Sequence, residues 1–383
     1  LPSYETCRED KRAFAQASRI IEVQSNRLHA ARLAQRTGEQ TVVVNPPYPP
    51  MSTAELDAVY ELPFTRLPHP RYAGKGEIPA YRMIRHSITI HRGCFGGCAF
   101  CTISAHQGKF VTPRSEASVL REVERVAAMP DFRGTITDLG GPSANMYGMA
   151  GRDRSLCEKC TRPSCISPAV CANLDTSHAR LRELYRRARE VKGVKHIFIG
   201  SGIRYDLLVK EFNTRGDARD MEEYLDQVVR YHVSGRLKVA PEHVSDRVLE
   251  VMRKPSFRYF HLFKQLFDRL NARAGKRQQI VPYFISSHPG SSVEDMAALA
   301  VETRAMDFRL EQVQDFTPTP MTISTDIYYS GYHPYTLRPV FTAKKPEEKK
   351  DQNVFFFWYR PENRARIARL LARFPALRKK LLG

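Results

Sequence analysis

The spacing of hydrophobic positions changes along the chain and predicts three regions. Over residues 1–40, Ala13, Ile20 and Leu28 fall near one face at helical spacing. Four prolines then occur between residues 46 and 50, which excludes a helix or a central strand there. We therefore expect a helix followed by a proline-rich arm over residues 1–85.

From residue 86 onward, short apolar strands alternate with helical segments. The predicted strands are 87–90, 135–137, 194–199, 237–240, 280–285 and 312–316. The predicted helices are 115–129, 181–191, 221–232, 245–273 (one or two helices) and 291–306, the last starting at a capping box of Ser291 and Glu294. Such alternation builds a parallel sheet with helices outside it. The predicted fold class is α/β, a six-repeat (β/α)6 partial TIM-type barrel over residues 86–320, with an open doubly wound sheet as the alternative. In both folds the functional face lies at the C-terminal ends of the strands.

The C-terminal extension, residues 321–383, is basic and rich in aromatic residues. Residues 341–383 hold 12 basic and 4 acidic residues, and five consecutive aromatics run from Phe355 to Tyr359. One interpretation is base stacking beside phosphate-binding arginines. We favour burial against the barrel, because consecutive aromatics are usually buried.

The charge balance bears on the partners of the protein. The chain has 60 basic and 41 acidic residues, a formal net charge of +19, which is typical of proteins with anionic partners such as nucleic acid. No run of 18 apolar residues occurs, so no membrane span is predicted. Leu1 is not followed by a charged and then apolar leader, so we expect a fragment or trimmed chain that is cytoplasmic.

Seven of the eight cysteines form two tight groups. Disulfide scaffolds are short and secreted, so clustered thiols in a chain this long indicate metal ligands. The first group, Cys94, Cys98 and Cys101, follows the first predicted strand with glycines between its thiols. Three thiolates hold three irons of a [4Fe–4S] cluster and leave the fourth open. The alternative is a zinc site completed by His86, His91 or His106.

This cysteine motif, with Phe100 just before its last cysteine, resembles the signature of radical S-adenosylmethionine (SAM) enzymes. The resemblance implies a [4Fe–4S] cluster whose open iron chelates SAM. It also implies reductive cleavage of SAM to methionine and a 5′-deoxyadenosyl radical, with an electron donor such as flavodoxin or ferredoxin.

A narrower resemblance is to the YgiQ family of radical SAM proteins, and it runs from about Pro2 to the C-terminus. Four segments carry it: Cys94–Lys109, Leu139–Met146, Leu237–Val248 and Phe316–Ser330. That family normally has a further N-terminal domain, which we expect this sequence to lack. The resemblance indicates a class of chemistry and no substrate.

Residues at the predicted strand ends are candidates for SAM binding. The superfamily places a Gly-Gly turn, here Gly140 and Gly141, against the methionine amino group, although Pro142 stands where an acidic residue is usual. Further candidates at strand ends are Ser201, Arg204, Glu242 and Ser287.

These four candidates differ in the part of SAM that they suit. Arg204 suits the SAM carboxylate through a bidentate fork, with Lys238 and Arg114 as alternatives. Ser201 and Glu242 suit the ribose hydroxyls. The turn around Ser287 resembles the turn near adenine in methylthiotransferase-type radical SAM enzymes.

The second cysteine group lies after the second predicted strand and consists of Cys157, Cys160, Cys165 and Cys171. Four thiols either complete a zinc site or hold a second [4Fe–4S] cluster, and their spacing does not decide between these metals. We expect one metal centre on the active face, because a loop of about 34 residues is rarely ordered without a local staple.

Two function classes remain open. The first is a radical SAM enzyme that abstracts hydrogen from an unknown substrate, which includes RNA and other anionic molecules. The alternative is a metal-stapled nucleic-acid-binding protein without radical chemistry. The three-cysteine count and the Gly140-Gly141 turn favour the enzyme, because a binding protein needs neither.

Overall fold

The computed structural model describes residues 1–383, apart from the side chain of Gln312. The chain opens with α1 (Tyr4–Glu9) and α2 (Lys11–Ser25), followed by an antiparallel hairpin of β1 (Leu33–Thr37) and β2 (Gln40–Val44). A two-residue turn that begins at Gly38, with φ +58°, joins the two strands, as is usual for hairpins. The prediction of a helix over residues 1–40 is therefore wrong beyond Ser25, because β-branched residues pair there instead.

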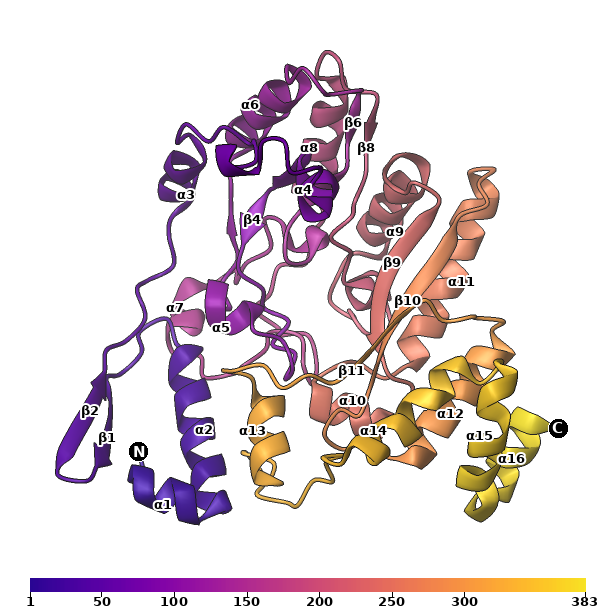
Figure 1. Cartoon of the computed structure of the whole chain (residues 1–383). Helices are drawn as coiled ribbons and strands as arrows, with labels where there is room; N and C mark the ends of the chain where they lie inside the picture. Colours follow the sequence, from indigo (N-terminus) through magenta and orange to yellow (C-terminus); the bar gives the residue numbers. More distant parts are fainter.

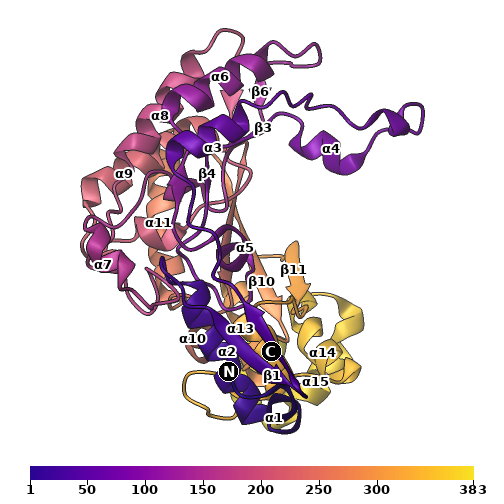
Figure 2. The ribbon, with the colours of Figure 1, turned by 90° about the vertical axis from the view of Figure 1, so that its left-hand side faces the viewer.

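The proline-rich arm continues through α3 (Thr53–Tyr60) and α4 (Pro79–Ile84). Asp57 in α3 accepts a hydrogen bond from the Ser115 amide at 3.0 Å, which fixes α3 to the body. Figure 2 shows the segment around α4 extending away from the rest of the chain.

Every predicted strand is present as a strand or part of one. The strands after the arm are β3 (Ser87–Thr89), β6 (Thr135–Ile136), β7 (Asp138–Gly140), β8 (His196–Ile197), β9 (Arg236–Glu242), β10 (Gln279–Ser286) and β11 (Gln312–Asp315), with a short antiparallel pair of β4 (His91–Arg92) and β5 (Thr112–Pro113). Parallel ladders join β3 to β7, β6 to β8, and β9 to β10 to β11. Within the described residues these ladders do not join into a closed barrel. The fold is therefore mixed α/β with parallel strands.

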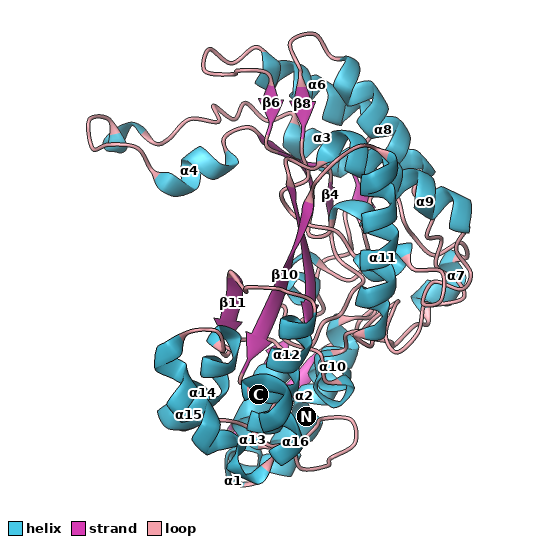
Figure 3. Cartoon of the chain, turned by 90° about the vertical axis from the view of Figure 1, so that its right-hand side faces the viewer, coloured by secondary structure: helices cyan, strands magenta, loops and turns pink.

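Helices separate successive strands, as predicted. They are α5 (Ile103–Gln107), α6 (Glu116–Ala127), α7 (Arg154–Glu158), α8 (Ala179–Glu190), α9 (Ala218–Gln227), α10 (Asp246–Met252), α11 (Arg258–Arg273) and α12 (Val293–Ala305). Figure 3 shows α8, α9 and α11 along the outer side of a curved molecule whose strands line the inner side. The capping box of α12 is formed by Ser292 and Asp295, one residue later than predicted.

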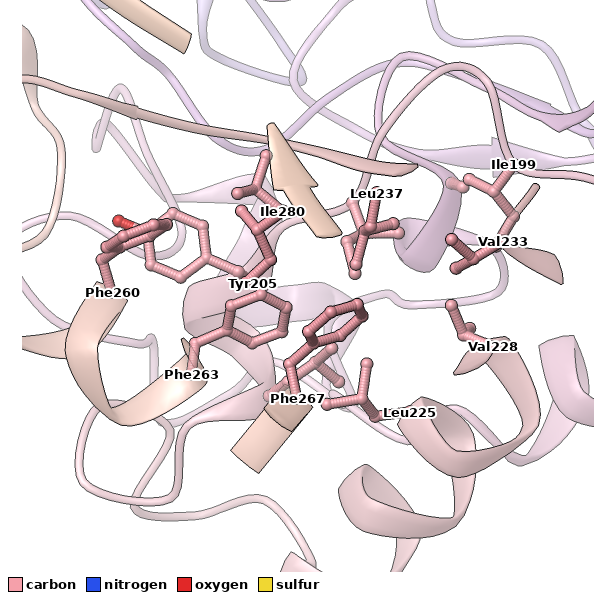
Figure 4. Packing of buried hydrophobic residues seen from close by; sticks show 14 of the residues in the cluster. Ile199, Tyr205, Leu225, Val228, Val233, Leu237, Phe260, Phe263, Phe267 and Ile280 are labelled. Carbon is pink, nitrogen blue, oxygen red and sulfur yellow. The ribbon is translucent and has the colours of Figure 1, made fainter. Parts of the chain in front are cut away.

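Aromatic side chains fill the space between α11 and the strands (Figure 4). Phe260, Phe263 and Phe267 recur at helical spacing and are completely buried, so they present one face of α11 to the core. They pack with Tyr205 and Leu237, which places the segment after β8 and the start of β9 on one continuous core. Truncation of one of these phenylalanines to alanine would cost about 3–5 kcal/mol.

The C-terminal extension adds α13 (Ile323–Ser330), α14 (Pro346–Asn353), α15 (Arg364–Leu370) and α16 (Pro375–Leu382), which gather at the lower end of the molecule in Figure 1. Phe355 and Phe356 are completely buried in the main core, so the prediction of burial is confirmed for them. Base stacking on these two rings is thereby excluded. Among the described residues, no helix combines the length and the apolar character needed to cross a membrane.

Candidate functional site

The first cysteine loop, residues 94–101, is held by the protein on several sides. The Cys94 amide donates to the Gly108 carbonyl at 3.1 Å, and the Ala99 amide donates to the Met252 carbonyl at 3.0 Å. A Cβ at Gly93, with φ +86°, would lie 2.2 Å from the Phe110 carbonyl oxygen, so only glycine fits there. The surrounding fold therefore fixes the path of this loop.

The three thiols of this loop share one cavity of about 290 Å³ with the ends of the parallel strands. The cavity contains three of the predicted SAM residues, Ser201, Arg204 and Glu242, and also the alternative Lys238. Its lining includes neither of the glycines at 140 and 141 nor Ser287. The structure thus brings half of the predicted SAM residues together with the predicted cluster ligands.

A larger cavity of about 440 Å³ lies against the same loop from the side of α2 and α13. It contains Cys98 and Cys101 but not Ser201, Arg204 or Glu242. Its lining includes polar side chains such as Glu22, Asn26 and Asp326, but none of the predicted SAM residues.

The chemistry of the donor set fits a cluster better than a single ion. Burial raises the pKa of the Cys94 thiol to about 12 and also raises that of Cys101, so a bound metal would have to displace their protons. Among the described residues, no three His, Cys, Asp or Glu side chains approach closely enough to hold one metal ion. The cavity lining includes none of the histidines of the zinc alternative, His86, His91 and His106, whereas a four-iron cube needs only the three thiolates.

Arg204 lies beside the first cysteine loop. Its Nε donates to Asp206 Oδ1 at 2.9 Å, a second nitrogen pairs with Asp206 Oδ2, and Nη1 donates to Cys98 Sγ at 3.4 Å. Burial alone would lower the pKa of Arg204, but Asp206 and Cys98 keep it well above its usual value. The fork predicted for the SAM carboxylate is thus taken by Asp206, and the remaining nitrogen faces a cluster ligand.

Glu242 and Lys254 form a second polar pair in the cavity. Lys254 Nζ lies 3.8 Å from Glu242 Oε1 and donates to the Ala240 carbonyl at 2.6 Å. Burial raises the pKa of Glu242, and Lys254 and Arg204 oppose that shift. Glu242 also has φ +69°, a strained conformation for a residue with a Cβ, and such strain concentrates at functional sites. Lys254 was missed because its segment was interpreted only as helix.

The Gly140-Gly141 turn is explained by the protein's own packing. A Cβ at Gly140 would lie 2.1 Å from Ser201 Oγ, and one at Gly141 would lie 2.5 Å from the His91 ring. Asp138 stabilises this turn, because its Oδ1 accepts from the Gly200 amide at 2.8 Å and from the Ser201 amide at 3.1 Å. Contact between the glycines and SAM stays a prediction. Asp138 was missed, although a carboxylate beside two glycines in a buried strand was a usable signal.

Ser287 is held by the C-terminal extension. Its amide donates to Gln352 Oε1 at 2.9 Å, and Ser287 has φ +58°. Its hydroxyl is buried and has no hydrogen-bond partner among the described residues. Tyr283, which sequence reasoning missed, lines the cavity from β10 instead. The alternative SAM ligand Arg114 is completely buried and pairs with Glu122, so its role is structural.

The second cysteine loop, residues 157–171, gathers its four thiols in one region. Asn173 Nδ2 donates to Cys157 Sγ at 3.4 Å, and Lys109 Nζ donates to Cys160 Sγ at 3.7 Å. Burial raises the pKa of the Cys165 thiol to about 11; Lys109 opposes this shift, and the neighbouring thiols of Cys171 and Cys160 add to it. The grouping predicted from the spacing is therefore present, and the metal stays a prediction.

Known proteins share long stretches of this sequence. Residues 1–87 match the family described as Radical SAM N-terminal, and residues 311–373 match a domain of unknown function, DUF3362. The first of these matches covers the whole arm over residues 1–85.

The UPF0313 protein of Bacteroides thetaiotaomicron is 58% identical over 97% of this chain and 60% of its own length. That of Methanocella arvoryzae is 45% identical over 100% of this chain and 62% of its own length. The chain therefore spans about 60% of the length of these relatives.

One solved structure with local similarity is the radical SAM methyltransferase TsrM from Kitasatospora setae, with cobalamin and a [4Fe–4S] cluster bound. It is 19% identical, with a TM-score of 0.40 over 63% of this chain and 38% of that one. The match of residues 1–87 to the Radical SAM N-terminal family agrees with the resemblance of the cysteine motif to radical SAM enzymes, and most of the chain is similar to UPF0313 proteins.

Proposed function

We propose that this protein is a radical SAM enzyme whose catalytic unit, residues 86–320, is a six-repeat partial barrel flanked by the arm over residues 1–85 and the extension over residues 321–383. Cys94, Cys98 and Cys101 hold a [4Fe–4S] cluster, and SAM binds beside it in the 290 Å³ cavity. The observation that carries the proposal is that three thiols and the polar ends of parallel strands share this one cavity. When bound, the cluster supplies the electron that cleaves SAM to methionine and a 5′-deoxyadenosyl radical, which abstracts hydrogen from the substrate.

The residues of the chain have separate tasks in this proposal. Arg204 holds positive charge at the Cys98 thiolate, and Asp206 fixes its orientation. Glu242 accepts hydrogen bonds from the ribose hydroxyls, and Lys254 opposes the rise in the Glu242 pKa that burial causes. Lys238 lines the same cavity and suits the SAM carboxylate now that the Arg204 fork is occupied.

The alternative of a nucleic-acid-binding protein loses part of its support from the C-terminal extension. Phe355 and Phe356 are buried, and Arg366 in α15 is paired with Glu347 and Asp351. The net charge of +19 remains compatible with RNA or another anionic molecule as the substrate of the enzyme.

Binding of SAM at the cluster gives a direct test. Anaerobically reconstituted, reduced protein should show a cluster electron paramagnetic resonance (EPR) signal that changes when SAM is added. Selenium- or nitrogen-labelled SAM should then broaden that signal through contact with the open iron. A signal that is indifferent to SAM would contradict the proposal.

A further inference from the structure

The second cysteine loop packs directly on the first. The Cys165 amide donates to the Phe95 carbonyl at 3.0 Å, and Ser164 Oγ donates to the Gly96 carbonyl at 2.8 Å. Thiols of both groups also pack against one apolar patch, formed by Phe95, Met146, Met149, Ile166, Leu174 and Leu207. Phe95 follows Cys94 directly in sequence. The hydrogen bond between Cys165 and Phe95 therefore joins the backbone of a cysteine in the second group to the backbone beside a cysteine in the first. The two groups are thus held in a fixed relationship.

Lys109 supplies a buried positive charge at the second group. This residue is 2% exposed, and its Nζ donates to the Arg162 carbonyl at 2.8 Å and to Cys160 Sγ at 3.7 Å. No carboxylate of the described residues pairs with it. An isolated buried ammonium is strongly unfavourable, so it requires an anionic partner. Four metal-bound thiolates provide that partner, whereas four neutral thiols do not.

The position of the loop favours an iron–sulfur cluster over zinc. A zinc ion has no redox chemistry and would only staple the loop. An iron–sulfur cluster exchanges single electrons, and the hydrogen bond from the Cys165 amide to the Phe95 carbonyl holds the second group beside the first.

We propose that Cys157, Cys160, Cys165 and Cys171 hold a second iron–sulfur cluster, balanced by Lys109, that relays single electrons to the first. The acceptor role of the first site rests on the proposed function above. A donor protein with a reduced flavin or iron–sulfur group loses one electron to the second cluster. The second cluster then loses it to the first, and no bond forms or breaks in the protein.

The second cysteine loop is accessible to such a donor. It begins in α7, which lies at the edge of the molecule in Figures 2 and 3. Leu156 in α7 is 57% exposed, next to Cys157. Lys159, two residues after Cys157, is also exposed. The apolar side chain of Leu156 therefore lies near a positive charge in sequence. This surface suits an acidic one-electron donor.

Metal analysis tests the site independently of any activity. Anaerobically reconstituted wild-type protein should contain about eight irons and eight sulfides per chain, and about half of each when Cys94, Cys98 and Cys101 are replaced with alanine. The fully reduced wild-type protein should also show EPR signals broadened by spin–spin coupling between neighbouring clusters. Zinc in the second group, or a count of about four irons, would overturn the proposal.

Kinetics test the relay. The ratio of 5′-deoxyadenosine formed with reduced flavodoxin to that formed with dithionite, a small reductant, should fall at least tenfold in Cys157→Ser and in Lys109→Met. Lys192→Met, at an exposed lysine outside both cysteine loops, is the control and should keep the wild-type ratio. An unchanged ratio in both test variants would overturn the relay. Absence of cleavage by the wild-type protein with either reductant would instead refute the proposed function.

Discussion

Arg204 Nη1 donates a hydrogen bond to Cys98 Sγ at 3.4 Å, although the two residues lie 106 positions apart in sequence. The segment after β8 is thereby joined to the first cysteine loop. Because Asp206 occupies the other side of the guanidinium, the positive charge is fixed at the thiol and is not free to follow a ligand. The cavity is thus organised around the cysteine loop before SAM enters.

Replacement of Arg204 by lysine should separate this effect from simple charge. Lysine keeps the charge but cannot bond Asp206 as a fork and reach Cys98 together. We expect a lower cluster midpoint potential and SAM cleavage slowed at least tenfold, which corresponds to about 1.4 kcal/mol. EPR-monitored redox titration measures the midpoint potential, and chromatography of 5′-deoxyadenosine measures the rate of SAM cleavage. Arg219→Lys, on the exposed side of α9, is the control, and an unchanged potential in Arg204→Lys would refute the assigned contact.

Gly97 should be intolerant of any side chain. A Cβ there would lie 2.4 Å from the Pro163 carbonyl oxygen, so the two cysteine loops could not keep their contact. Gly275 has a φ of +63°, close to the +61° of Gly97, and has open space around it. Gly275→Ala therefore measures the cost in stability of this backbone conformation without a steric clash. We expect Gly97→Ala to lower the free energy of unfolding by about 2 kcal/mol more than Gly275→Ala and to reduce iron content. Equal denaturation midpoints for both variants would contradict the packing described.

Glu242→Gln should weaken SAM binding. The amide keeps the shape of the carboxylate but loses one acceptor, and a hydrogen bond from a ribose hydroxyl to a charged group is worth about 1.5–3 kcal/mol. We expect the SAM dissociation constant to rise about tenfold or more, measured by anaerobic equilibrium dialysis. Glu250→Gln, on the exposed side of α10, should bind SAM like the wild type. A wild-type constant in Glu242→Gln would remove this residue from the SAM site.

The fold should lose stability in mild acid. Burial lowers the pKa of His91 and His232 to about 4 and that of His288 to about 3, while unfolded histidine titrates near 6.5. At pH values between the folded-state and unfolded-state pKa values, the unfolded chain binds more protons than the folded chain. The stabilisation is therefore complete above pH of about 6.5 and is lost as pH falls toward 4, by up to about 3 kcal/mol per residue.

Urea unfolding of metal-loaded protein at several pH values between 7.5 and 5 measures this loss. His91→Asn should show a shallower dependence on pH than the wild type. His196→Asn, which changes an exposed histidine, should keep the wild-type slope. Identical slopes for all three proteins would contradict the assignment to His91.

The sequence predicted the elements better than their contacts. Strands such as 280–285 and helices such as 115–129 carry their periodicity locally, so their positions were confirmed. The hairpin at 33–44 was missed because a helical pattern was extended across it to residue 40. Gly140 and Gly141 were predicted to contact SAM, which stays a prediction, and their close approaches to Ser201 and His91 were not foreseen. Such close approaches join distant segments and leave no periodic signal in either one.

The candidate site also combines features that local sequence predicts with contacts that only the fold reveals. The two cysteine groups were identified from spacing alone, because the thiols of each group are close in sequence. Lys254 and Tyr283 reach the cavity from separate elements, and Asp206 binds Arg204, so only the fold reveals these roles. The partner of the Arg204 fork could not be inferred either, because Asp206 and a SAM carboxylate offer the same geometry.

The formation of 5′-deoxyadenosine tests the central claim most directly. Anaerobically reconstituted protein with SAM and dithionite should release 5′-deoxyadenosine and methionine in equal amounts. Cys98→Ala, in which one of the three thiols is lost, should release neither, while Cys7→Ala, far from the motif in sequence, should behave like the wild type. Undiminished cleavage in Cys98→Ala, or none in the wild-type protein with a full complement of iron and sulfide, would contradict the assignment of this chain as a radical SAM enzyme.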